Sequence, residues 1–153
     1  MSELVSASIP DLATVASWIH SAELCHQWAG VRVRFPIQVG LLATEIEFRI
    51  ADSWCLAENE QVVAFGQIIP KAESRLHLAR LIVSPMYRGR GLGRALAGQL
   101  LERALARSPE RVSLNVFPDN VAAVALYRSL GFRRIERPAS ELESTSHYME
   151  RAV

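Results

Sequence analysis

The stretch RLIVSPMYRGRGLGRAL, from Arg80 to Leu96, decides the fold of this 153-residue chain. It begins with an apolar run typical of a buried strand, and it reaches Ser84-Pro85, where the proline ends sheet pairing. A turn with three alternating glycines follows. After the turn, leucines recur on one face and predict a helix from about Leu92 to Arg107. The stretch therefore predicts a strand, a glycine-rich turn and a helix.

The turn itself has the features of an anion site. Without Cβ atoms at Gly89, Gly91 and Gly93, the backbone can approach a ligand closely. The first N–H groups of the following helix have no intrahelical partners, and the helix dipole favours negative charge there. The arginines around the glycines add guanidinium groups that pair well with phosphate. These arginines are Arg88, Arg90 and Arg94.

Three kinds of phosphate loop compete for this turn. A P-loop would end in lysine followed by serine or threonine, but Arg94-Ala95 stands there, so that interpretation fails. The glycine spacing also departs from the Gly-x-Gly-x-x-Gly dinucleotide fingerprint. The third pattern, a Q/R-x-x-G-x-G/A pyrophosphate loop, is met in full by Arg88, Gly91 and Gly93. A tight turn that needs glycines for geometry alone stays open as an alternative.

Hydrophobic patterning predicts the elements around this stretch. Three consecutive strands precede the glycine turn, and the strand–helix–strand order after it favours an α/β fold with helices packed on one mixed sheet. The segment 23–36 is predicted to be irregular. The predicted strands are 4–8, 54–58, 62–69, 76–83, 111–116, 132–135 and 147–151, and the predicted helices are 10–19, 38–49, 92–107 and 120–130.

Bulk composition predicts a single domain over residues 1–153. With a formal net charge of +1, nothing indicates binding to nucleic acid, and no apolar stretch is long enough to span a membrane. Cys25 and Cys55 form no metal or redox spacing, and no signal peptide is recognisable. We expect a cytoplasmic, reduced protein without a metal, either monomeric or homodimeric.

A second motif follows downstream of the glycine turn. It reads LNVFPDN over residues 114–120, then Leu126-Tyr127, and ends in Leu130-Gly131-Phe132. With the first motif and the preceding hairpin, the pattern covers roughly residues 61–135. It resembles the GNAT N-acetyltransferases, especially bacterial enzymes related to ribosomal-protein alanine acetyltransferase. The resemblance implies a mostly antiparallel sheet flanked by helices, with a splay between its fourth and fifth strands.

The resemblance also implies how acetyl-CoA binds. The pantetheine arm would pair with the strand edge in the splay, and the pyrophosphate would lie on the amides of the glycine turn. Asn120 matches an asparagine near the cofactor, although it is equally suited to cap a helix. The expected cofactor-binding residues are Leu81, Ile82, Val83, Arg88, Gly89, Arg90, Gly91, Leu92, Gly93, Arg94 and Asn120.

The resemblance assigns the general acid to Tyr127, whose phenol stays protonated at neutral pH. The alternative is a core tyrosine with its hydroxyl at the rim. Relatives acting on ribosomal-protein N-termini often carry a glutamate where this chain has Asn115. His77, eleven residues before Arg88, matches the base position of histone-type relatives, and a pKa near 6.5 would suit it. Glu73 is a weaker candidate, and an α-amine needs no base if water carries its proton.

The acceptor is expected to border the segment 23–36, through Trp28 and Phe35. Nearby arginines would suit an aromatic or carboxylate-bearing amine. The alternative is that both aromatic side chains fill the core. The sequence therefore predicts acetyl transfer to a primary amine, of a small molecule or of a peptide or protein N-terminus, by direct attack in a ternary complex. A non-catalytic acyl-CoA-binding module and a dinucleotide-binding protein are the alternatives.

Overall fold

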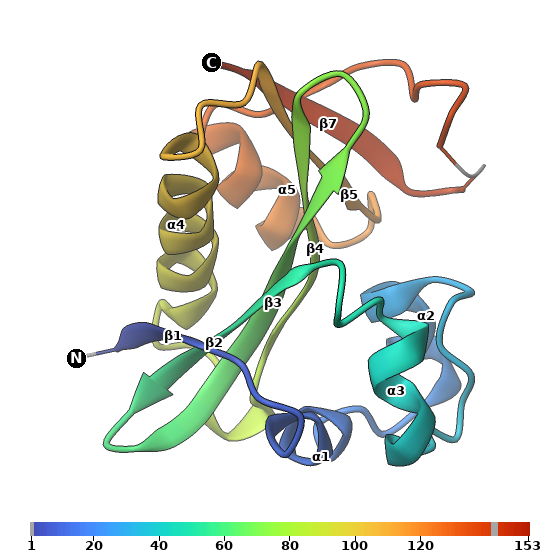
Figure 1. Ribbon diagram of the computed structural model, residues 1–153, viewed down its shortest axis with the longest axis vertical. Helices are drawn as coiled ribbons and strands as arrows, with labels where there is room; N and C mark the ends of the chain where they lie inside the picture. Colours follow the sequence, from blue (N-terminus) through green and yellow to red (C-terminus); the bar gives the residue numbers. More distant parts are fainter. Residues whose placement is uncertain (1, 142–143) are drawn as a thin grey trace.

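The computed structural model describes residues 2–141 and 144–153. Within them, seven strands form one sheet in the order β1-β2-β3-β4-β5-β7-β6 (Figure 1). Every neighbouring pair is antiparallel except β4 and β5, which are parallel. The strands are β1 Glu3–Ser6, β2 Asp52–Glu58, β3 Gln61–Lys71, β4 Arg75–Val83, β5 Arg111–Val116, β6 Arg133–Arg134 and β7 His147–Ala152. The helices are α1 Asp11–Ala16, α2 Ala22–Ala29, α3 Val39–Glu45, η1 Pro85–Tyr87 (a single 3₁₀ turn), α4 Leu92–Leu105 and α5 Val121–Ser129.

Helices cover both faces of the sheet and enclose two hydrophobic cores. Alternate residues of the strands point to opposite sides, so that Leu56 and Ala64 join the core with α4 while Cys55 and Phe65 join the other. The second core contains apolar residues of α1, α2 and α3. Figure 1 shows α4 and α5 on one side of the sheet and the three short helices on the other. The predicted mixed sheet flanked by helices is therefore confirmed.

The sequence predicted segment 23–36 to be irregular, but its first part belongs to a helix. Helix α2 begins after Ser21, whose hydroxyl accepts the N–H of Leu24 at 3.1 Å, and it ends at Gly30, which has a φ of 61°. Cys25 and Trp28 are buried three residues apart. The serine cap, the spacing of the two buried residues and the glycine could have indicated this helix. The apolar pattern spans only two turns, however, which is too short to show a clear helical period.

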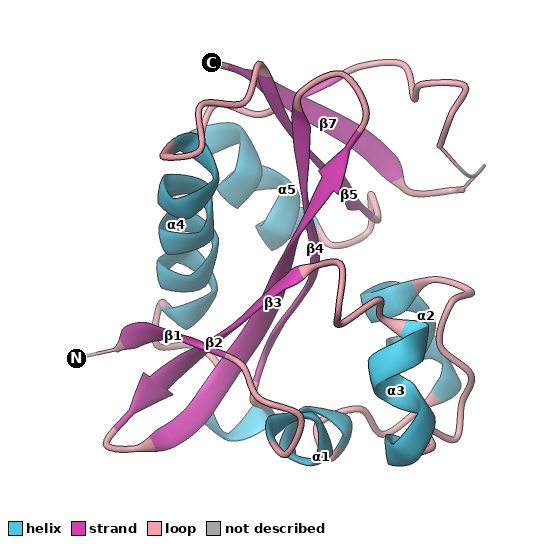
Figure 2. Cartoon of the chain, in the orientation of Figure 1, coloured by secondary structure: helices cyan, strands magenta, loops and turns pink. Residues whose placement is uncertain are grey.

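The sheet opens at the point where its strands first run parallel. Pairing between β4 and β5 covers Arg75–Leu78 only, so in the described chain the residues from Ala79 to Val83 have no β5 partner. A bulge at Arg80, which has a φ of 53°, bends β4 at the same place. Figure 2 shows β4 and β5 diverging toward their C-terminal ends. The predicted splay is confirmed, and it leaves backbone groups of β4 free for a ligand.

Candidate active site

A pocket of about 630 Å³ lies at the splay. Its lining comes from the end of β4, the glycine turn, the start of α5 and the C-terminal part of α2. It includes nine of the residues expected to bind the cofactor: Leu81, Ile82, Val83, Arg88, Gly89, Gly91, Leu92, Gly93 and Asn120. The structure thus brings together a free strand edge and a glycine turn that are separated by a 3₁₀ turn in the chain.

The glycine turn is shaped for close contact with a ligand. Gly89 and Gly91 have φ values of 77° and 76°, a region that favours glycine, and Gly91 is the N-cap of α4. A Cβ placed on Gly89, Gly91 or Gly93 would meet open space, so no described residue fills the position in front of the helix. Because the first amides of α4 face this space without intrahelical partners, the turn fits a pyrophosphate group.

The three arginines of the turn differ in their surroundings. The pocket lining includes Arg88. Arg90 lies 3.5 Å from a carboxylate oxygen of Glu58 and stacks over the ring of Tyr87 at 5.3 Å. Arg94 donates a hydrogen bond to Ser129 at 3.3 Å. Of the three, Arg88 is therefore the arginine in the described lining of the pocket, and Arg90 and Arg94 have partners elsewhere.

Asn120 caps a helix and also lines the pocket. Its side-chain oxygen accepts the N–H of Ala123 at 3.2 Å and so caps α5, and the residue also lines the pocket. The cap fixes where α5 begins. This start point in turn sets how far along the helix Tyr127 lies.

Tyr127 lies on the face of α5 that points into the pocket. Its ring packs edge-on against Phe132, with centroids 6.2 Å apart, in the core beneath α4. Burial raises the pKa of the phenol to about 12. The ring thus packs in the core, as the alternative proposed, and its hydroxyl stays protonated at neutral pH.

His77 is buried and tied to β5 by two contacts. Its Nδ1 lies 2.7 Å from Ser113 Oγ, which also accepts a hydrogen bond from Arg75. Its Nε2 lies 3.4 Å from the side-chain nitrogen of Asn115, whose oxygen accepts a hydrogen bond from Arg137 at 2.6 Å. Because Arg137 turns the amide N–H of Asn115 toward Nε2, the ring proton belongs on Nδ1. The lone pair of Nε2 then faces the N–H of Asn115, and both residues line a second pocket.

The pKa of His77 differs from the value near 6.5 assumed for a base at this position. Burial lowers it to about 3, with further lowering by the surrounding cations. The imidazole is therefore neutral at physiological pH, but it is a weak proton acceptor in this environment. The cations that act on it are Lys71, Arg75, Arg80 and Arg137.

The second pocket, of about 410 Å³, adjoins the first through α2. Gln27 and Trp28 line both pockets. Trp28 is 7% exposed, and its indole N–H donates to the carbonyl of Arg80 at the bulge, at 2.8 Å. Trp28 is therefore a core residue, as the alternative proposed, and its side also lines the pocket. Phe35, at 38% exposed, is not among the described lining residues of either pocket.

Sequence reasoning missed several residues of the second pocket. Arg137 and Ser146 lie on the segment between β6 and β7, and Lys71 and Arg80 lie on strands β3 and β4. Nothing in the local sequence marks Arg137, because it belongs to no motif and reaches the pocket only through the path of its loop. Arg80 begins the stretch that decides the fold, so its position was noticeable in the sequence. The bulge that turns it inward could not be predicted, because it arises from the pairing of β4 with β3.

Comparison with known proteins agrees with this arrangement. The model of the acetyltransferase (GNAT) family matches residues 19–132, and the chain belongs to this family. Acetyl-CoA, the cofactor expected from the sequence, is the acetyl donor that the family uses. The resemblance stated from the two motifs is therefore confirmed.

Individual relatives match over parts of their length. The [ribosomal protein bS18]-alanine N-acetyltransferase of Escherichia coli is 38% identical over 77 residues, which are 50% of this chain and 51% of that protein. The chain spans about half or less of the length of the first curated relatives that it matches.

Solved structures match over almost the whole chain. The ribosomal-protein-S18-alanine N-acetyltransferase from Escherichia coli has a TM-score of 0.74 at 25% identity, covering 99% of this chain and 94% of that one. The PaiA N-acetyltransferase of Thermoplasma acidophilum, solved with coenzyme A, has a TM-score of 0.75 at 17% identity, covering 100% of this chain and 99% of that one. At that identity the second likeness concerns the fold alone.

Two further observations concern the described residues only. None of the helices in residues 2–141 and 144–153 has the length and apolar character needed to cross a membrane. The same residues contain no group of three or more His, Cys, Asp or Glu side chains placed to hold a metal ion.

Proposed function

We propose that this protein transfers an acetyl group to a primary amine, of a small molecule or of a peptide or protein N-terminus, by direct attack in a ternary complex. Acetyl-CoA supplies the activated acetyl thioester when bound. The observation that carries the proposal is the pair of adjoining pockets that share Trp28 and Gln27. The first offers the strand edge Leu81–Val83 and the glycine turn, and the second offers room for an acceptor.

The residues of the first pocket hold the donor and provide a proton. The free amides at the end of β4, near Val83, are preorganised donors for the oxygen that becomes negative during attack. Tyr127 keeps its proton up to strongly alkaline pH because burial raises the pKa of its phenol to about 12. That proton is available to the departing sulfur, which makes Tyr127 the proposed general acid.

The second pocket favours an uncharged amine, which is the form that attacks. The cations that lower the pKa of His77 also disfavour a protonated amine beside it. The Nε2 lone pair of His77 faces the amide N–H of Asn115 and so helps to hold the Asn115 side chain at the pocket. We therefore assign His77 to positioning, and the proton of the attacking amine leaves through water.

Replacing Tyr127 with phenylalanine tests the proposal most directly. Because the hydroxyl alone is removed, we expect turnover to fall by about 10²-fold or more, the range for loss of a general acid. The apparent affinity for acetyl-CoA should change little. Turnover is measured by release of the free thiol of coenzyme A over a panel of amines and peptides.

Tyr148→Phe is the matched control. Its hydroxyl is also buried, but it bonds Glu150 and the residue is not among the described lining of either pocket. This variant should keep its turnover. Undiminished turnover in the Tyr127→Phe protein would remove Tyr127 as the acid.

A non-catalytic acyl-CoA-binding module is the second candidate. The observations that favour it are Asn115 in place of a carboxylate and the low proton affinity of His77. Stabilisation by acetyl-CoA, with no thiol released in the presence of any amine or peptide of the panel, would support the module and reject the enzyme.

A further inference from the structure

The second pocket carries an excess of positive charge. Among its described lining residues, two carboxylates, Glu47 and Glu141, accompany four cations. The four cations come from different elements, namely α2's C-terminal loop, β3, the β4 bulge and the β6–β7 loop. They are Arg32, Lys71, Arg80 and Arg137.

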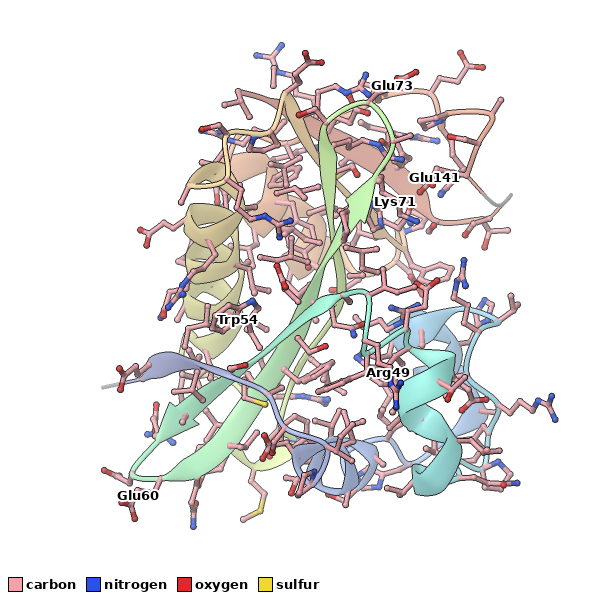
Figure 3. The ribbon with its side chains drawn as sticks, in the orientation of Figure 1. Arg49, Trp54, Glu60, Lys71, Glu73 and Glu141 are labelled. Carbon is pink, nitrogen blue, oxygen red and sulfur yellow. The ribbon has the colours of Figure 1, made fainter. Side chains whose placement is uncertain are left out.

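Both carboxylates already have cationic partners. Glu47 lies 3.5 Å from Arg32. Glu141 lies 3.7 Å from Lys71 and 3.4 Å from Arg75, and Figure 3 shows Lys71 and Glu141 beside the end of β3. Pairing therefore uses up the negative charge of the described lining. Neither Arg80 nor Arg137 has a carboxylate within 4.0 Å among residues 2–141 and 144–153.

Arg137 is held in place by neutral groups. One nitrogen donates to Asn115 Oδ1 at 2.6 Å, and the other donates to the carbonyl and hydroxyl of Ser146 at 2.8 and 2.9 Å. These bonds fix the guanidinium without neutralising it. A fixed guanidinium is a preorganised partner for a carboxylate, because little side-chain entropy is lost on binding.

Arg80 adds a buried charge on the opposite wall. One nitrogen donates to Gln67 at 2.7 Å and to the carbonyl of Ile46 at 3.3 Å, and its Nε has no partner in the described chain. Burying this cation is costly, and the attraction of Glu47 is countered by the repulsion of Arg32. Burial lowers the pKa of Arg80 to about 10, which leaves it charged at neutral pH. A negative group in the pocket would compensate this cost.

His77 reports the sign of the potential between these walls. Four cations lower its pKa, and among residues 2–141 and 144–153 no carboxylate raises it. The groups facing it are Lys71 from β3, Arg75 and Arg80 from its own strand, and Arg137 from the β6–β7 loop. The centre of the second pocket is therefore electropositive.

We propose that the second pocket selects an acceptor whose primary amine is accompanied by a carboxylate, with Arg137 as the residue that binds this carboxylate. The inference rests on the proposed acetyl transfer and narrows its substrate class to anionic amines. Amines that carry only further positive charge would be disfavoured in the same pocket, because like charges repel there.

Matched acceptor pairs test the proposal. Each amino acid of a panel is compared with its carboxamide, which has the same side chain and amine but no carboxylate, and polyamines represent cationic acceptors. The kcat/KM for thiol release is measured with acetyl-CoA in excess. We expect the free acids to exceed their amides by about 10-fold or more, as for loss of a hydrogen bond to a charged group.

Variants connect the preference to Arg137. Arg137→Gln should remove most of the preference for the free acid, and Arg137→Lys should restore part of it because the charge returns without the guanidinium fork. Arg134→Gln, an exposed arginine outside the described lining of both pockets, is the control and should keep the preference. Binding of an N-acetylated amino acid to the CoA-loaded protein, measured by calorimetry, should weaken in parallel.

The outcomes separate the two proposals. Amides or polyamines that react as well as the free acids would overturn the inference while leaving acetyl transfer intact. A preference that survives in Arg137→Gln would also overturn it, because the carboxylate would then be bound elsewhere. Failure of every acceptor to release thiol, despite stabilisation by acetyl-CoA, would reject acetyl transfer and this inference together.

Discussion

At the scale of single residues, neighbours set the chemical state of each candidate group. His77 and Tyr127 have the side chains that the sequence motifs require, but burial moves their pKa values in opposite directions, to about 3 and about 12. For both residues the uncharged form is favoured. The site therefore presents a neutral imidazole and a protonated phenol over the whole physiological range.

The low pKa of His77 predicts a dependence of stability on pH. Below about 6.5 the unfolded chain takes up a proton at this residue and the folded protein does not, so folding loses stability as the pH falls from about 6.5 toward 3. The contribution of this one group has a slope of at most about 1.4 kcal/mol per pH unit.

His77→Gln removes the titration while keeping a polar side chain. We expect the free energy of unfolding of this variant, measured with urea between pH 5 and 7, to fall less steeply toward acid than that of the unchanged protein. The other histidines are common to both proteins, so their effects cancel in the difference. Equal slopes in the two proteins would show that His77 is protonated in the folded state.

At the scale of elements, the start of α4 combines a left-handed turn with open space in front of the helix. Gly91 caps the helix with a φ of 76°, while Gly93 lies within the first turn with open space before it. The first glycine is needed for the backbone, and the second leaves room in front of the helix. The two roles can be separated by experiment, because substitution with alanine should affect protein stability differently at the two glycines.

Alanine substitutions at these glycines are expected to have opposite effects on stability. Gly91→Ala should destabilise the free protein by about 1 kcal/mol or more, since left-handed backbone is unfavourable for alanine. Gly93→Ala should stabilise it by up to about 1 kcal/mol, since alanine is the better helix former. Both should weaken stabilisation by acetyl-CoA, measured as the shift of Tm with added ligand.

Gly98→Ala provides the control in the same helix. Its Cβ meets open space and the residue is not among the described lining of the pocket. It should raise stability and leave the response to acetyl-CoA unchanged. A Gly93→Ala protein that responds to acetyl-CoA normally would favour the alternative in which the glycines serve turn geometry alone.

At the scale of the whole molecule, the two hydrophobic cores position the elements that line the two adjoining pockets. The core with α4 supports the glycine turn and Tyr127, and the core with α2 supports Trp28. The Trp28 indole joins them through its hydrogen bond to the carbonyl of Arg80 at the β4 bulge. Ligand binding at the splay therefore contacts elements from both cores.

Acetyl-CoA is expected to stabilise the whole domain against heating. A ligand at a hundred times its Kd stabilises the folded state by about 2.7 kcal/mol, and for a protein of this size each kcal/mol raises Tm by about 2–4 °C. The expected increase is thus about 5–10 °C in a thermal melt. NAD at the same concentration should have no effect, and stabilisation by NAD alone would establish a dinucleotide site instead.

Local sequence determined most features of the first pocket, where acetyl-CoA is expected to bind. Alternating glycines, the arginine at position 88, and the proline after β4 act through backbone geometry and spacing, which neighbouring residues in the chain settle. The same holds for the Asn120 cap and for the distance from it to Tyr127. These features could be predicted because their physical causes lie within a few residues of each other.

Tertiary structure decided the rest. The contact of His77 with Ser113, the Trp28 contact with the β4 bulge and the position of Arg137 depend on residues that are 22 to 52 positions apart in the chain. Helix α2 was missed because two turns have little periodicity of their own and gain stability from packing. The charge of the second pocket also depends on the tertiary structure. Its cations come from separate strands and loops, and the electrostatic potential depends on their distances in space.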